Sequence, residues 1–187
     1  MNWRAAGAVL ALVVGTAPLL ARDIAPEPDD YRWEHYRAPV PATLKGARVV
    51  STEQAEAIWS AGQAAFIDVL PRAPKPPNLP AGTIWRDRPR LDIPGSIWLP
   101  DTGYGALSSA TEHYLKRGVA DASGGDKSRL LVIYCQADCW MSWNAAKRVL
   151  SYGYKNVAWY PDGTDGWEQA LLPLTPAQPK PRDDAEN

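Results

Sequence analysis

An uninterrupted apolar run, Leu130-Leu131-Val132-Ile133-Tyr134, leads directly into the only two cysteines of the chain, Cys135 and Cys139. A helix is predicted from about Met141 to Tyr152, because apolar residues recur there at helical spacing and Gly153 follows as a stop. A strand without polar interruptions that passes through a short loop into a helix is typical of a parallel sheet with both faces covered.

The same alternation of strand and helix extends over most of the chain. Further strands are predicted at 65–70, at 97–99 after a turn at 94–96, and at 157–160. Further helices are predicted at 110–117, at 167–171, and from a capping box at 51–54 through about Ser60. A turn is predicted at 161–166, and exposed loops are predicted at 71–82 and 120–127. This order predicts an α/β domain with a parallel sheet flanked by helices.

The two ends differ in composition from the middle. Residues 1–21 match a secretory signal, with Arg4, an apolar stretch and Ala21 as a cleavage position; an uncleaved anchor is the alternative. No later segment is apolar enough to span a bilayer, so we expect a periplasmic protein without a membrane span after signal removal. We predict an extended N-terminal arm at 22–43, one domain at 44–174 and a disordered, proline-rich and charged tail at 175–187.

Several kinds of function are disfavoured by composition. A formal net charge of −1 does not suit nucleic acid or an anionic membrane as the main partner. His35 and His113 are far apart in the sequence, so no metal site is predicted, and Asp162–Gly166 is interpreted as a turn because it lacks the later glutamate of a calcium loop. There is no phosphate-binding glycine loop and no nucleophile-elbow serine, and no cofactor is predicted.

The spacing of Cys135 and Cys139 leaves two interpretations open. Two cysteines in an exported protein form a disulfide by default, and an i, i+4 pair around a tight loop can reach the required Cα separation. In one interpretation Cys135 is the reactive sulfur and Cys139 resolves the mixed disulfide that Cys135 forms. In the other, the disulfide is a permanent staple that closes the loop.

Several short motifs, in this order, resemble the rhodanese-like domain over about residues 44–174. They are Ile67-Asp68-Val69, the Pro94-Gly95-Ser96-Ile97 turn, Val132-Ile133-Tyr134-Cys135, Ala145-Ala146, Gly153-Tyr154-Lys155-Asn156-Val157 and the turn at 163–167. The resemblance implies that Cys135 occupies the place of the nucleophile, where loop amides stabilise a thiolate or a persulfide. It also implies that Asp68 organises hydrogen bonds around the loop.

A narrower resemblance covers nearly the whole mature chain. Cys135-x-x-x-Cys139-Trp140-Met141-Ser142-Trp143-Asn144, the Tyr160–Trp167 segment and the Tyr36–Pro41 arm are similar to the exported PQQ-dependent catabolism-associated CXXCW motif proteins, although three residues separate the cysteines here instead of two. That family is associated with alcohol oxidation by pyrroloquinoline quinone (PQQ) enzymes. The resemblance implies a PQQ-dependent dehydrogenase or a cytochrome c as the partner.

The loop departs from a rhodanese in its charge. Trp140, Met141 and Ser142 stand where a rhodanese places an Arg or Lys that holds an anionic donor, and Asp138 adds a negative charge that opposes thiolate formation. Standard thiosulfate transfer is therefore not expected. These four residues and Asp68 are the predicted binding residues, with Trp140 as a lid over the sulfurs. The nearest basic strip, Arg86, Arg88 and Arg90, is interpreted as a solvated face.

Two hypotheses of different classes follow. The first is an exported accessory protein with thiol–disulfide or sulfur-handling chemistry at Cys135 and Cys139, serving PQQ-dependent alcohol oxidation. The second is a non-catalytic binding module with a structural disulfide, which docks on a periplasmic dehydrogenase or cytochrome through its Trp-rich face.

Overall fold

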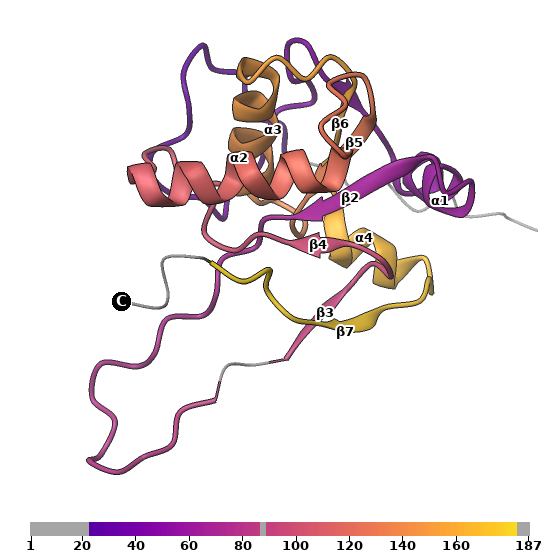
Figure 1. Ribbon diagram of the computed structural model, residues 1–187. Coiled ribbons are helices and arrows are strands. Elements are labelled where there is room, and N and C mark those ends of the chain that lie inside the picture. Colours follow the sequence, from indigo (N-terminus) through magenta and orange to yellow (C-terminus); the bar gives the residue numbers. More distant parts are fainter. Residues whose placement is uncertain (1–22, 87–88, 183–187) are drawn as a thin grey trace, which may run out of the picture.

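The computed structural model describes residues 23–86 and 89–182, and its centre is a parallel sheet (Figure 1). The predicted signal at 1–21 lies outside the described residues. The strand order is β1-β6-β5-β2-β4, and every neighbouring pair is parallel. The strands are β1 (Arg48–Val49), β2 (Ala64–Asp68), β4 (Ile97–Trp98), β5 (Leu130–Tyr134) and β6 (Val157–Tyr160). The predicted fold class is confirmed.

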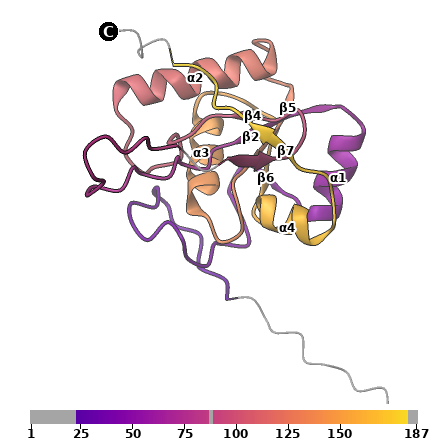
Figure 2. The same ribbon diagram turned by 90° about the horizontal axis from the view of Figure 1, so that it is seen from below.

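In the part of the chain that the structure describes, four helices cover the two faces of the sheet: α1 (Thr52–Ser60), α2 (Ser109–Ser123), α3 (Trp140–Ser151) and α4 (Gly163–Gln169). In Figures 1 and 2, α2 and α3 lie on one side and α1 and α4 on the other. Alternate residues of β5 enter different cores: Leu131 and Ile133 pack with α2 and α3, whereas Val132 and Tyr134 pack with α1 and α4. Burial on both sides explains why β5 has no polar alternation.

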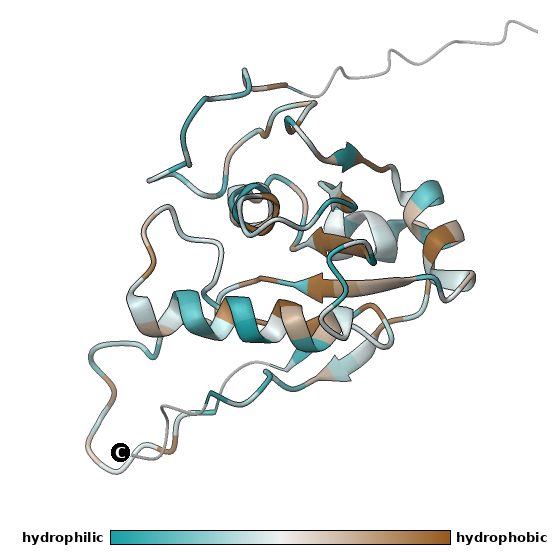
Figure 3. Cartoon of the chain, turned by 45° about the horizontal axis from the view of Figure 1, so that its top comes forward, coloured by the Kyte–Doolittle hydropathy of each residue, from teal (hydrophilic) through white to brown (hydrophobic). Residues whose placement is uncertain are grey.

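The surface of α2 shows how the helices divide between core and solvent. Figure 3 shows hydrophobic colour on the central strands and alternating hydrophilic and hydrophobic residues along this helix. The helix begins after Ser108, whose side chain accepts from the Thr111 amide, and ends at the left-handed Gly124. It therefore runs through part of the loop predicted at 120–127, because Val119 and Ala122 continue its buried stripe.

The segment predicted as a turn at 161–166 belongs largely to a helix, since α4 begins at Gly163 and ends at Gln169. Gly163 has a φ of +52°, and a Cβ atom there would lie 2.6 Å from the carbonyl oxygen of Cys135. Gly163, one of the glycines that suggest a turn in the sequence, thus permits a close approach between α4 and the cysteine loop. Trp167, which is completely buried, anchors the helix against the sheet.

The tail predicted to be disordered from residue 175 is ordered through residue 182, which corrects that prediction; residues 183–187 lie outside the described residues. Its first residues form β7 (Thr175–Ala177), antiparallel to β3 (Arg90–Asp92). Pro179 then pairs with Trp98 on the edge strand β4, and the Lys180 amide donates to the Trp98 carbonyl at 2.9 Å. The proline-rich, charged tail therefore pairs with a sheet edge and covers it, although its composition is typical of disorder.

Two segments without regular structure complete the described chain. The proline-rich loop after β2 is exposed over most of its length and leaves the body of the domain, as predicted for 71–82 (Figure 1). The N-terminal arm, residues 23–43, is extended and contributes Val40 to the core cluster on the α3 side. Within the described residues, no helix is both long and apolar enough to cross a membrane.

We predict that Lys180→Pro lowers the free energy of unfolding by about 1 kcal/mol more than Lys180→Ala, because only the proline removes the amide that donates to Trp98. Both variants lose the ion pair with Asp121, so alanine is the matched control. Urea unfolding followed by tryptophan fluorescence measures the difference. Equal stabilities would contradict an ordered tail.

Candidate functional site: the disulfide loop at the carboxyl edge of the sheet

The two cysteines are joined in a disulfide that closes the loop between β5 and α3. Their Cα atoms are 6.4 Å apart. Cys135 follows the last residue of β5, and Cys139 is the N-cap residue of α3, whose side chain makes no capping hydrogen bond. Cys135 is 0% and Cys139 2% exposed, so both sulfurs belong to the core and a thiol in solution has no direct path to them.

One side of the loop is held by the start of α4. The Thr164 amide donates to the carbonyl of Cys135 at 3.1 Å, and Gln136 pairs with Gly163 in an isolated antiparallel bridge. Asp138 has a φ of +52°, a left-handed conformation that turns the chain toward α3. The loop is therefore fixed at its first two residues and bent at its fourth.

The other side of the loop is covered by the N-terminal arm. Arg37 pairs with Cys139 in an antiparallel bridge. The Ala38 amide donates to the Asp138 carbonyl at 3.1 Å, and the Trp140 amide donates to the Tyr36 carbonyl at 2.9 Å. The arm thus acts as a short strand added to the loop, and it leaves neither of these loop groups to solvent.

The predicted binding residues that follow Cys139 do not face an open site. Trp140 is 2% and Met141 3% exposed, and Ser142 is completely buried with its hydroxyl bonded to the Cys139 carbonyl. The Trp140 indole donates to the carbonyl of Pro39 in the arm at 3.0 Å. Trp140 is therefore covered by the arm and is not a free lid, whereas Asp138 stays partly exposed at the bend.

Asp68 reaches the loop through a residue whose role the sequence did not reveal. Arg90 on β3 lies 2.7 Å from the completely buried Asp68 carboxylate through Nε. Its Nη1 donates to the Thr164 hydroxyl at 3.2 Å, and its Nη2 donates to the Cys135 carbonyl at 3.3 Å. The interpretation of Arg90 as part of a solvated strip is wrong. Its partner Asp68 lies 22 residues earlier in the chain, so no local spacing pointed to this pair.

A second buried carboxyl group, Asp92, extends this network. Its Oδ1 accepts from the Tyr134 hydroxyl, which also contacts Ser96 at 2.7 Å, and its Oδ2 has no hydrogen-bond partner among the described residues. Burial, reinforced by the charge of Asp92 and opposed by Arg90, raises the pKa of Asp68 to about 7. Burial also raises the pKa of Asp92. Because Arg90 supplies one positive charge to two buried carboxyl groups, ionisation of both at once is disfavoured.

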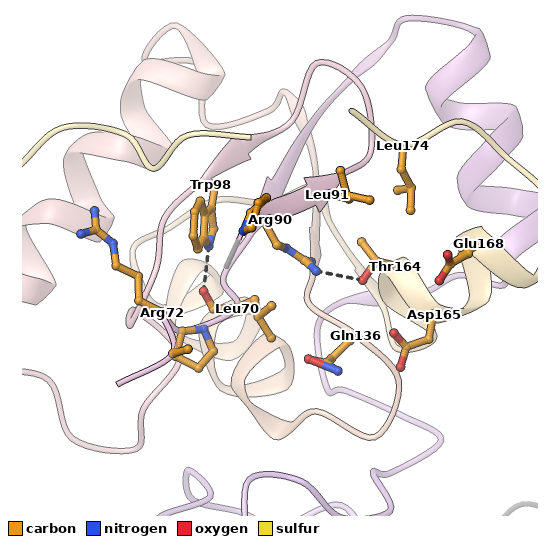
Figure 4. Close-up of a pocket in the computed structure, with 13 residues that line it drawn as sticks. Leu70, Arg72, Arg90, Leu91, Trp98, Gln136, Thr164, Asp165, Glu168 and Leu174 are labelled. Carbon is orange, nitrogen blue, oxygen red and sulfur yellow. Dashed lines mark hydrogen bonds between the residues drawn. The ribbon is translucent and has the colours of Figure 1, made fainter. Parts of the chain in front are cut away.

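A pocket of about 420 Å³ lies beside this network (Figure 4). Arg90 points toward Thr164 at its centre, Arg72 lies at one end, and Asp165 and Glu168 lie at the other. Gln136 is the residue of the cysteine loop that lines it. Because neither cysteine lines the pocket, a ligand there contacts the loop without reaching the disulfide.

The rhodanese-like domain family model matches residues 51–170, and the chain belongs to this family. The matched segment lies inside the predicted domain at 44–174 and contains both cysteines, while the arm precedes it. No curated protein matches the sequence.

Solved structures with a similar fold include sulfurtransferases. The chain is 20% identical to a thiosulfate sulfurtransferase from Pseudomonas aeruginosa, with a TM-score of 0.49, over 72% of this chain and 21% of that one. It is 17% identical to a polysulfide-sulfur transferase from Wolinella succinogenes, with a TM-score of 0.43, over 76% and 85% of the two chains. It is 18% identical to EanB, with a TM-score of 0.50, over 85% and 38%. The chain therefore spans about a fifth of the first of these proteins, and the likeness concerns the fold.

We predict that stability falls as the pH rises from 4 to 7, and that Asp68→Asn makes this fall smaller. The folded pKa of Asp68, about 7, exceeds its ordinary value of 3.8, so in this range the folded state binds the proton and the unfolded state releases it. Glu53→Gln, on the exposed part of α1, is the control. Urea midpoints across this pH range measure the effect, and the same slope in Asp68→Asn and the parent would contradict it.

Proposed function

We propose that this rhodanese-like protein performs thiol–disulfide exchange or sulfur handling at Cys135 and Cys139. The observation that carries the proposal is the position of the disulfide, which spans the strand–loop–helix junction where the family resemblance places the nucleophile. In the reduced protein, the Cys135 thiolate attacks a partner disulfide, and one partner sulfur leaves as a thiolate. Cys139 then attacks Cys135, which releases the second partner sulfur and restores the internal disulfide.

The charges around the loop support exchange over thiosulfate transfer. The described part of the loop and the first turn of α3, residues 135–143, contain Asp138 and no Lys or Arg. Arg90 approaches from β3, but its donors are directed at the Asp68 carboxylate, the Thr164 hydroxyl and the Cys135 carbonyl. Arg37 of the arm likewise directs Nη1 at a loop carbonyl, that of Ala137. Exchange between sulfurs needs no cation for an anionic donor.

The proposed setting is export and service to PQQ-dependent alcohol oxidation, with a dehydrogenase or cytochrome c as partner. Its support is the signal-like composition of residues 1–21 and the resemblance of the CxxxCW and Tyr36–Pro41 segments. Fractionation of cells that express the full chain, with the mass of the recovered protein, tests export. A periplasmic protein that has lost about 21 residues supports it, and a full-length protein in the cytoplasm overturns it.

The second candidate is a binding module in which the disulfide is a permanent staple. The burial of both sulfurs favours it, because a resting exchange site usually exposes at least one sulfur. The two functions differ in the reduction potential of the same bond, which equilibration with glutathione buffers and mass detection measures. For exchange we expect about −200 mV or higher, whereas a value below about −300 mV establishes the staple.

We also predict unequal behaviour of the two single-cysteine variants. Cys139→Ser leaves the attacking sulfur without its resolving partner, so it accumulates a mixed disulfide with added glutathione disulfide at least about tenfold faster than Cys135→Ser. Mass spectrometry measures the adducts. Both variants lose the stabilisation of the internal disulfide, so each controls for loss of fold in the other. Equal loss of stability without adducts would support the staple.

A further inference from the structure

The arm is held both by its side chains, among which Val40 lies in the core and Tyr36 packs against it, and by a series of hydrogen bonds to its backbone. The Trp140 indole donates to the Pro39 carbonyl at 3.0 Å, and the Trp143 indole donates to the Thr43 carbonyl at 3.1 Å. The Asn144 side chain accepts from the Arg32 amide and donates to the Arg32 carbonyl, both at 2.8 Å. These three side chains are buried on α3, within the segment that immediately follows Cys139.

Further contacts extend the same pattern along the arm. Lys147 donates to the Asp29 carbonyl at 2.7 Å. The loop itself binds the Tyr36 carbonyl and the Ala38 amide. Over residues 29–43, the loop and α3 thus bind main-chain groups that any extended polypeptide carries, which is how a sheet edge binds an added strand.

The arm is also loosely packed on itself at its N-terminal end. A hollow of about 360 Å³ is bounded by arm residues, among them Pro28 and Trp33, and by Trp140 of α3. The Trp33 side chain is 56% exposed. The arm precedes the segment that matches the family, residues 51–170, so it is a separate segment lying on a face of the family domain.

From these contacts we infer that the cysteine loop and α3 form a binding site for an extended polypeptide, and that the arm fills this site until a partner segment replaces it. The inference rests on the proposed function in one respect, which is that the partner segment carries the cysteine that exchanges with Cys135. The partner that we infer is an extended segment of another protein, because the cysteine loop and α3 form hydrogen bonds with backbone groups beside the disulfide.

The first experiment measures binding without any sulfur chemistry. The probe is a fluorescent peptide with the sequence of residues 29–43, and the protein is the full chain with Ala38→Pro, which loses the arm amide that donates to Asp138. Ala38→Ser keeps that amide and is the matched control. We expect the Ala38→Pro protein to bind the peptide at least about tenfold more tightly than the control, because the tethered arm competes less well.

A second pair of variants shows where the peptide binds. Trp140→Phe removes the indole that donates to Pro39, and Trp98→Phe removes an indole that donates to Leu70, away from the arm. In the Ala38→Pro protein, we expect Trp140→Phe to weaken peptide binding about fivefold or more, in line with the loss of one hydrogen bond, and Trp98→Phe to leave it unchanged. No binding at about 1 mM peptide, or equal effects of the two variants, overturns the site.

Sulfur chemistry is tested separately with the same peptide carrying Ala38→Cys as a thionitrobenzoate disulfide. The Cys135 thiolate attacks the peptide sulfur, the peptide–thionitrobenzoate bond breaks and the thionitrobenzoate anion leaves, so the peptide is the oxidant. We expect a peptide adduct in the Ala38→Pro protein with Cys139→Ser and none with Cys135→Ser. Binding without an adduct supports the site and overturns the proposed exchange.

The occupant is tested by the size of the Ala38→Pro protein. A partner segment predicts a monomer that binds the peptide in a one-to-one complex. A dimer that the peptide dissociates would mean that the arm of a second copy fills the site, and this result overturns the inference of a partner segment. Size-exclusion chromatography with light scattering, at two protein concentrations, separates these outcomes.

Discussion

The carboxyl edge of this sheet depends on one largely buried guanidinium. Arg90 joins the end of β2, through Asp68, to the carbonyl of Cys135 and to Thr164 in the first turn of α4. These segments are distant in the sequence, and each brings a polar group to a place where water has little access. Truncating one partner of a buried ion pair typically costs about 3–5 kcal/mol, because the remaining charge is left unpaired. The position of the cysteine loop therefore depends on Arg90 as well as on the disulfide.

The disulfide and the arm constrain the loop from its other side. The disulfide fixes the distance between the end of β5 and the start of α3. The arm then forms hydrogen bonds with the Asp138 carbonyl and the Trp140 amide, which face it. An antiparallel bridge to Cys139 forms although the arm has no strand of its own. In this arrangement the tryptophans after Cys139 are core residues whose indole groups also donate hydrogen bonds to the arm. The CxxxCW segment thus contains the disulfide and also binds the extended N-terminal arm.

Local patterns predicted the parts of the fold that local forces determine. The apolar runs at β2, β5 and β6 and the capping box of α1 identified those elements, since burial on both faces and capping leave their mark within a few residues. β3 and β7 are too short to show a period, and they pair across more than 80 residues of sequence. The cysteines were recognised as the candidate site from their position, but Arg90 and the arm were not connected to them. Both contacts are long-range, and nothing in the spacing of the residues specifies them.

Burial of the disulfide does not by itself exclude exchange, because the cover is a separate segment with its own stability. Four hydrogen bonds hold residues 36–39 to the loop and to Trp140, and each contributes about 1 kcal/mol to stability. Release of these four residues returns about 1–2 kcal/mol of conformational entropy each, which equals or exceeds that loss. Apolar contacts such as those of Val40 remain as the main barrier. Opening of residues 36–39 breaks these arm contacts and leaves the pairing of the central sheet intact, so it is a local event, and a partner segment that supplies equivalent backbone contacts lowers its cost.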